Sequence, residues 1–304
     1  MSHISTATHA LIDGVCFPNA YQRLYQRDDI EDIEPLYLTT RWASLAEYGP
    51  ILVKLKNTNL VDEACKATSD SLYRSLSLLS TPASTLDLSH HLRHFITFKG
   101  VEGQSKLLRF ADPLVARHWL SSYGSPLPAV LMGPMAAWWV ANWAPNWAES
   151  YPLRWQAFLA DSMPAADTIA LSDELPPMGH AQHAALDAVT RWQLKERLTE
   201  YLAQHSAAQW ERLPMEERGQ WLDNRLNDAS AWGATTERQL AIWLGLALQW
   251  GNHFMTAGEG LYAHWVSHSP NAIRLSRQEQ LKALDTWSRT NATTLTTTDE
   301  EPHG

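Results

Sequence analysis

The spacing of the apolar residues changes along this chain, and the change restricts the folds that the chain can adopt. Up to about residue 150, short apolar runs end at turn residues, as in 9–14, 51–55 and 129–132, which is typical of strands. From about residue 181 onward, apolar residues recur every three or four positions, which is typical of amphipathic helices. The sequence therefore predicts an α+β protein, with an N-terminal mixed α/β lobe followed by an all-α C-terminal lobe.

The length and the proline distribution predict two domains. A chain of 304 residues is long enough for about two domains. Prolines gather in residues 160–180, which is typical of a connection between domains. The last residues are rich in Thr, Asp and Glu, as disordered tails are. We predict a mixed α/β domain over residues 1–150, a linker over 151–180, a helical domain over 181–289 and a disordered tail over 290–304.

Other local patterns complete the predicted secondary structure. We expect further strands over residues 36–38, 95–98 and 107–110, the last two being paired. A helix is expected over residues 60–80, because its leucines follow helical spacing. In the C-terminal lobe we expect helices around residues 186–202, 222–229 and 240–248. Thr236 and Gln239 form a capping box at the start of the third of these helices.

Charge and termini argue against several classes of protein. The net charge of −9 argues against general nucleic-acid binding, which needs basic patches to neutralise phosphates. The uncharged stretch between Arg117 and Glu149 is broken by prolines, so it lacks the run of about 20 apolar residues that a membrane span needs. No secretory signal is visible at the N-terminus. We therefore predict a cytoplasmic protein that binds neither nucleic acid nor membrane.

The usual catalytic signatures are missing from the sequence. It has no phosphate-binding loop, no GxSxG elbow and no HExxH motif. Cys16 follows the first predicted strand, and we interpret it as a small buried thiol rather than as a nucleophile. Two cysteines cannot form a four-cysteine zinc site. We predict no enzyme, no metal and no cofactor.

Histidine pairs keep one enzymatic alternative open. His180 and His183 stand three residues apart, and His264 and His268 four apart, so each pair shares one face of a helix. Divalent metals use such pairs, but a catalytic site needs a third ligand and an open position. A metal-dependent hydrolase is therefore the less favoured alternative.

The chain holds 15 tryptophans, and all but Trp42 and Trp119 stand at or after residue 138. Tryptophan is enriched both in cores and at protein–protein hot spots. Pro134 and Pro145 divide this segment into pieces that we expect to be too short to bury every ring. The candidate partner-binding anchors are Trp138, Trp139, Trp143 and Trp147.

Residues 28–34 read DDIEDIE and hold five acids. Such a run forms either a solvated face or an acidic patch that steers a basic partner. In the second case the partner-binding residues are Asp28, Asp29, Glu31 and Asp32.

Several segments resemble one protein family. ALIDG (Ala10–Gly14) and GPILVKL (Gly49–Leu55) are similar to the two opening motifs of the type VI secretion effector chaperones, also called adaptors. LLRFADPLV (Leu107–Val115) resembles the family's most diagnostic signature, with Ala111 where the family often has an aromatic residue. Two later segments, Leu131–Trp139 and Ala231–Phe254, are similar to the Gly-Pro segment and to a helical motif of the family.

The resemblance implies a non-enzymatic cytoplasmic protein. Such a chaperone binds a cognate toxic effector and helps load it onto the VgrG spike. For Arg109 and Asp112 we favour a structural role over partner binding, with Arg109 bonding nearby carbonyls or Asp112, and with Asp112-Pro113 starting a helix. The other motif residues that we expect to be structural are Gly49, Pro50, Gly133 and Pro134. An immunity-type protein that neutralises a toxin stays open as an alternative.

Overall fold

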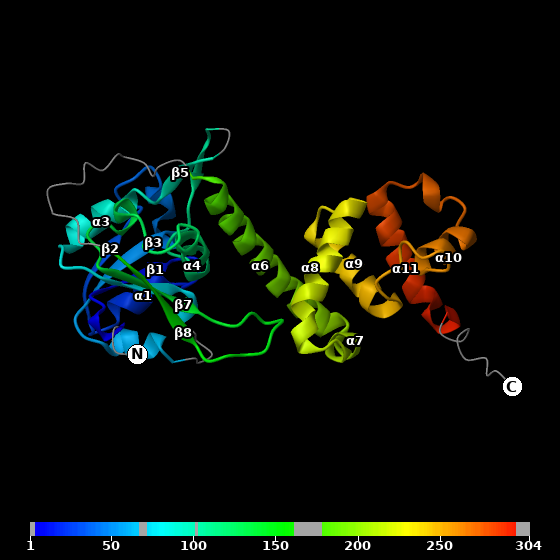
Figure 1. Cartoon of the computed structure of the whole chain (residues 1–304), viewed down its shortest axis with the longest axis horizontal. Coiled ribbons are helices and arrows are strands. Elements are labelled where there is room, and N and C mark those ends of the chain that lie inside the picture. Colours follow the sequence, from blue (N-terminus) through cyan, green and yellow to red (C-terminus); the bar gives the residue numbers. More distant parts are fainter. Residues whose placement is uncertain (1–3, 67–71, 101–102, 161–177, 296–304) are drawn as a thin grey trace. The chain divides into compact units, whose positions relative to one another are not determined.

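The computed structural model describes residues 4–66, 72–100, 103–160 and 178–295 of the chain (Figure 1). The described residues divide into two compact units. Unit 1 comprises the described parts of 1–144 and 151–191, and unit 2 comprises 145–150 and the described residues from 192 onward.

Unit 1 is built on an antiparallel sheet. Its six strands lie in the order β2-β3-β1-β4-β7-β8. They are β1 (His9–Asp13), β2 (Ile30–Pro35), β3 (Pro50–Leu55), β4 (Leu76–Ser80), β7 (Ala137–Asn142) and β8 (Arg154–Leu159). All five residues of β1 are buried, as expected of a strand with neighbours on both sides and helices on both faces. A separate hairpin pairs β5 (Thr97–Lys99) with β6 (Ser105–Leu107).

Helices cover both faces of this sheet. They are α1 (Ala20–Tyr25), α2 (Asn59–Ala64), α3 (Thr85–Arg93), α4 (Pro113–Ser121) and the short α5 (Ala129–Met132), and 3-10 turns occupy η1 (Ile4–Thr6), η2 (Ala43–Tyr48) and η3 (Leu72–Arg74). Leu24 of α1 and Leu60 of α2 share a buried cluster with Trp139. Trp138 points to the opposite face, since successive residues of a strand alternate, and its ring stacks on that of Phe95. Figure 1 shows α1, α3 and α4 around the strands.

Unit 2 is helical. Its elements are α7 (Ala207–Arg212), α8 (Met215–Trp232), α9 (Glu237–Trp250), α10 (Leu261–His268), η4 (Ala272–Arg274) and α11 (Arg277–Leu295), together with the part of α6 (His180–His205) from residue 192. Leu202, Leu222, Leu244 and Leu281 are fully buried in one cluster. The capping box of α9 is present, with Thr236 Oγ1 accepting from Gln239 N at 3.3 Å.

The predicted fold class is confirmed, with sheet and helices in the N-terminal part and helices alone beyond residue 180. The strands expected over 9–14 and 51–55 are β1 and β3. The pairing expected between 95–98 and 107–110 is present as the β5–β6 hairpin, but its strands lie at 97–99 and 105–107, and residues 108–110 are not in a strand. The helices expected around 186–202, 222–229 and 240–248 lie within α6, α8 and α9.

Several local predictions are wrong. Residues 129–132 form a helical turn rather than a strand, because a four-residue apolar run fits either state. Leu76 and Leu79 lie in β4, so the helix expected over 60–80 is limited to α2 and η3 in the described residues. Residues 36–38 form a turn after β2.

The predicted boundaries also need correction. Residues 154–159 form β8 of the sheet, so the linker expected over 151–180 starts too early, and residues 161–177 lie outside the described part. Helix α11 continues to Leu295, so the tail expected from residue 290 starts too early, and residues 296–304 lie outside the described part as well. Among the described helices, none is long and apolar enough to span a membrane.

Candidate functional site

Two of the motif segments meet in one ion cluster of unit 1. Asp13 ends β1, and Arg109 and Asp112 lie in the turn that leads into α4. Arg109 Nη2 lies 2.9 Å from Asp13 Oδ1 and 3.4 Å from Asp112 Oδ2. Both carboxylates are buried, whereas 39% of the Arg109 side chain is exposed. One guanidinium therefore bridges two buried carboxylates at the edge of the core.

The Asp13 carboxylate also shapes the backbone that follows β1. Its Oδ1 accepts hydrogen bonds from Val15 N at 2.9 Å and from Cys16 N at 3.0 Å. This is the usual behaviour of an Asp that closes a turn on its own backbone. The carboxylate therefore fixes the position of Val15 and ties it to Arg109.

A third motif segment, at Gly49-Pro50, joins this cluster through the backbone. Gly14 N donates to Gly49 O at 3.0 Å. A Cβ on Gly14 would collide with the Glu47 carbonyl oxygen, and one on Gly49 would collide with the Tyr37 ring. Glycine is required at both positions by this close approach, and Pro50 begins β3 directly behind it.

Asp112 caps α4. Its Oδ1 accepts from Leu114 N at 2.9 Å, and Pro113 occupies the first turn of the helix, where proline is well tolerated. Together with the contact to Arg109, this agrees with the structural role predicted for these residues. Gly133 and Pro134 have structural contacts too: Gly133 packs against the His91 ring, and Pro134 O accepts from Thr81 Oγ1 at 2.7 Å.

Two carboxylates outnumber the single guanidinium, and this affects the protonation of the cluster. Burial, reinforced by the charge of Asp13, raises the pKa of Asp112 to about 6. Burial of the thiol, together with the same two carboxylates, raises the pKa of Cys16 to about 12. At neutral pH the cluster therefore carries a net charge of −1, with Cys16 protonated.

The cluster does not fit a metal. Asp13, Cys16 and Asp112 place potential ligand atoms within 4.8 Å of one another. However, the Arg109 guanidinium already lies among them, with Nη2 2.9 Å from Asp13 Oδ1 and 3.4 Å from Cys16 Sγ, and its positive charge opposes a metal cation at the same place. The expectation of a buried Cys16 is wrong for the residue as a whole, which is exposed.

The raised pKa of Asp112 predicts a specific pH dependence. Between the unfolded pKa near 3.8 and the folded pKa of about 6, the folded state binds more protons than the unfolded state. The Asp112 contribution to stability is therefore fully present below pH 3.8 and is lost as the pH rises through 6. Asp112→Asn keeps a good N-cap and removes this titration. We expect the free energy of unfolding of the variant, relative to that of the wild type, to increase by about 2–3 kcal/mol as the pH rises from 4 to 7.

Urea titration of both proteins across this pH range checks the expectation. Other titrating groups, including the buried His9, affect both proteins alike and cancel in the difference. A difference that stays constant with pH would show that Asp112 is ionised throughout.

The four candidate tryptophan anchors are all buried, so the expectation that some rings stay uncovered is wrong. Trp138 and Trp139 lie in β7 between β4 and β8, a strand that is covered on both faces. Trp138 Nε1 donates to Ser77 Oγ at 2.8 Å. Trp143 packs against Tyr73, and Trp147 packs in unit 2 against Trp192. These rings are core residues and cannot anchor a partner on the surface.

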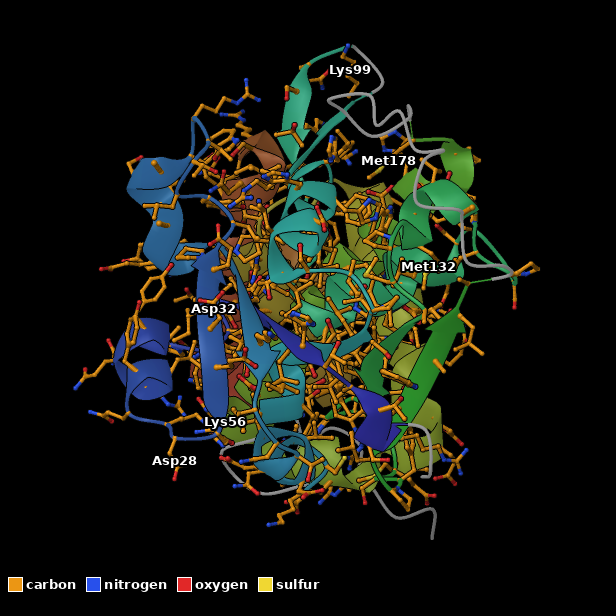
Figure 2. The ribbon with its side chains drawn as sticks, turned by 90° about the vertical axis from the view of Figure 1, so that its left-hand side faces the viewer. Asp28, Asp32, Lys56, Lys99, Met132 and Met178 are labelled. Atoms are coloured by element: carbon orange, nitrogen blue, oxygen red, sulfur yellow. The ribbon has the colours of Figure 1, made fainter. Side chains whose placement is uncertain are left out.

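The acidic run lies on and beside β2, which is an edge strand of the sheet. Asp29 is buried and pairs with Arg27 at 2.7 Å, Glu31 pairs with Lys54 at 2.7 Å, and Glu34 pairs with Arg93. Asp28 and Asp32 are exposed, and no other described residue forms an ion pair with either. Figure 2 shows both along this edge, with Lys56 close to Asp28. Three of the five acidic residues are thus paired with basic residues outside the run, and the run is not a uniform acidic patch.

The histidine pairs do not assemble a site within the described residues. The His264 and His268 rings are tilted against each other with their centroids 4.6 Å apart, and His268 Nδ1 lies 2.9 Å from the His264 carbonyl oxygen. His183 packs beside Phe98. The one cluster of three potential ligands found in the described part of the chain contains no histidine.

Sequence reasoning missed a groove beside the ion cluster. It has a volume of about 620 Å³ and lies between the turn and helix after β1 and the end of η2. Val15, Pro18 and Tyr21 line one side, and Glu47 and Tyr48 line the other. Tyr48 directly precedes the Gly49-Pro50 motif, and Val15 follows the Asp13-Gly14 motif. The two motifs could therefore have indicated this place, had their proximity been known.

Residues 8–126 match the model of a protein family described as a domain of unknown function, DUF4123. This family is known as a domain of type VI secretion effector chaperones or adaptors. The N-terminal part of the chain is therefore similar to a domain of this family. The matched span contains the ion cluster and the groove, whereas residues 131–139 and 231–254 lie outside it. No curated protein and no solved structure matches the chain.

Proposed function

We propose that this protein is a non-enzymatic cytoplasmic adaptor that binds one cognate type VI secretion effector and helps load it onto the VgrG spike. The general kind of role is supported by the family model that matches residues 8–126, because that family is associated with type VI secretion adaptors. The effector, the spike and the absence of enzymatic activity are the proposal.

One observation carries the proposal. The motif segments of the matched span converge on a single corner of unit 1, where Arg109 joins β1 to the start of α4 and Gly14 joins β1 to the Gly49-Pro50 turn. This corner forms a fixed frame around an open groove rather than around a set of reactive groups. Its thiol is protonated and its cation is an arginine, which supports a binding role over a catalytic one.

Co-purification tests the proposal. The full chain, tagged and expressed with the products of the neighbouring genes, should retain one toxic effector and the VgrG protein. Deleting its gene should stop secretion of that effector and leave the cells as resistant to the toxin as before. If the deletion instead sensitised the cells to the toxin, the protein would be of the immunity type. If no neighbouring product bound, the adaptor role would be wrong.

A further inference from the structure

The groove between α1 and η2 has walls that are fixed before any partner arrives. Tyr21 Oη donates to Ala46 O at 3.0 Å and so ties α1 to η2. On the other side, the Asp13 carboxylate holds the backbone of Val15 at 2.9 Å, and Arg109 holds Asp13 in turn. A preformed groove binds a ligand without the cost of ordering its own walls.

Large apolar side chains are exposed around this groove. Val15 is 50% exposed and Tyr48 is 61% exposed, and both line it. Tyr25 lies one helical turn after Tyr21 on α1 and is 72% exposed. Leu45 of η2 is exposed as well. Exposed apolar side chains that gather in one place mark an interaction site.

The charge around the groove has one sign. Glu47 is exposed and lines the groove, and neither Lys nor Arg is among the lining residues. The nearby Arg23 is turned onto the Phe17 ring, with its Cζ 3.8 Å from the ring centroid. The ion cluster behind the Val15 turn adds a net charge of −1, because Arg109 faces both Asp13 and Asp112. A ligand here therefore meets apolar side chains such as Val15 and Tyr48, the polar side chains of Asn19 and Gln22, and the carboxylate of Glu47.

From these features we propose that the groove binds a short segment of the cognate effector, in which an apolar side chain is followed closely by a lysine or arginine. The apolar side chain lies against Val15 and Tyr48, and the basic side chain pairs with Glu47. All residues that line the groove lie within residues 8–126, the span that matches a family associated with effector chaperones, and we therefore assign the groove to the effector. This inference rests on the proposed function and names the surface that binds the effector.

Photo-crosslinking identifies the occupant directly. The full chain, carrying p-benzoylphenylalanine in place of Tyr48, is purified together with the effector and the spike and then irradiated. We expect a crosslink to an effector peptide that contains an apolar residue next to a lysine or arginine. The same amino acid in place of Leu86, an exposed residue of α3, should give no such product. A crosslink from position 48 to the spike, or none at all in a complex that forms, would overturn the inference.

Paired substitutions test the energetics. Val15→Asp and Glu47→Lys are each expected to weaken effector binding by at least about tenfold, as read by calorimetry with the full chain. Glu47→Gln should have a smaller effect than Glu47→Lys. The matched controls, Leu86→Asp and Asp28→Lys, change exposed residues away from the groove and should bind as the wild type does.

The outcomes separate this inference from the function on which it rests. If the wild-type chain binds no effector, the proposed function fails. If the wild type binds the effector and the groove variants bind equally well, only the groove is wrong. Should Asp28→Lys alone weaken binding, the docking surface would be the β2 edge instead. If Val15→Asp lowers the melting temperature, Val15→Ala and Tyr48→Ala replace it, because they add no charge. Unchanged effector affinity in both of these variants would also exclude the groove.

Discussion

Replacing Phe95 by alanine is expected to lower the free energy of unfolding of unit 1 by about 3–5 kcal/mol. The Phe95 ring is buried and lies at the centre of an aromatic cluster. Its centroid is 5.0 Å from that of His91, 5.6 Å from Phe110, 5.4 Å from Trp119 and 6.4 Å from Trp138. Removing the ring leaves a cavity that these large, rigid neighbours cannot fill, and it removes edge-to-face contacts as well.

Urea titration of the full chain, followed by hydrogen exchange of the β1 and β7 amides, measures this loss in unit 1. Phe95→Leu retains part of the apolar volume and should lose less stability than Phe95→Ala. Leu86→Ala, at an exposed position of α3, should change the stability by less than about 0.5 kcal/mol. A loss below about 1 kcal/mol for Phe95→Ala would mean that the aromatic cluster repacks freely.

Replacing Arg109 by methionine is expected to cost about 3–5 kcal/mol at pH 7. The substitution retains much of the apolar stem but leaves the buried Asp13 and Asp112 carboxylates facing each other without a cation. Without the cation, the charge of Asp13 raises the folded pKa of Asp112 further above its unfolded value. The loss should therefore shrink as the pH is lowered towards 4, because protonating one carboxylate removes the repulsion.

Two comparisons isolate the charge effect. The double variant Arg109→Met with Asp112→Asn should be more stable at pH 7 than Arg109→Met alone, because only one buried carboxylate remains. Arg197→Met breaks a bidentate pair with Glu237 on an exposed surface, and should cost at most about 1 kcal/mol. Equal losses for the two arginines would show that the Arg109 cluster is as well solvated as a surface pair.

Local periodicity predicted the long elements of this fold well. The apolar residues of α6, α8 and α9 recur over several turns, so the helical pattern could be distinguished from a strand pattern. The capping box at Thr236 requires only two residues at a fixed spacing, and it was predictable for that reason.

Short apolar runs were predictable only in part. Leu76 and Leu79 have a spacing that suits a helix, yet they lie in β4, because pairing with β1 and β7 decides the state of so short a segment. Strand β2 was not predicted from the acidic run 28–34, because Ile30 and Ile33 are only two apolar residues among five acidic ones and do not alternate as in a strand. Periodicity cannot report which distant strand is available as a partner.

The site was predictable as motifs but not as an arrangement. Arg109 and Asp112 were singled out from the sequence, whereas the bond to Asp13 spans 96 residues and leaves no trace in local spacing. The tryptophans misled for a related reason. Pro134 and Pro145 suggested exposed pieces, but β7, which holds Trp138, has a strand on each side, and Trp143 packs against the distant Tyr73. Only the tertiary structure determines these contacts.

Unit 2 is assembled from two separate stretches of the chain, residues 145–150 and the residues from 192 onward. Trp147 of the first stretch packs on Trp192 of the second with ring centroids 5.2 Å apart, and Lys195 Nζ lies 4.6 Å from the Trp147 ring centroid. Genetic recombination at a single point between residues 150 and 192 separates the two stretches of this unit. A crossover near residue 180 would join foreign helices to the resident Trp147. The hexapeptide and the distal helices are therefore expected to be inherited as a pair, even where the rest of the gene is shuffled.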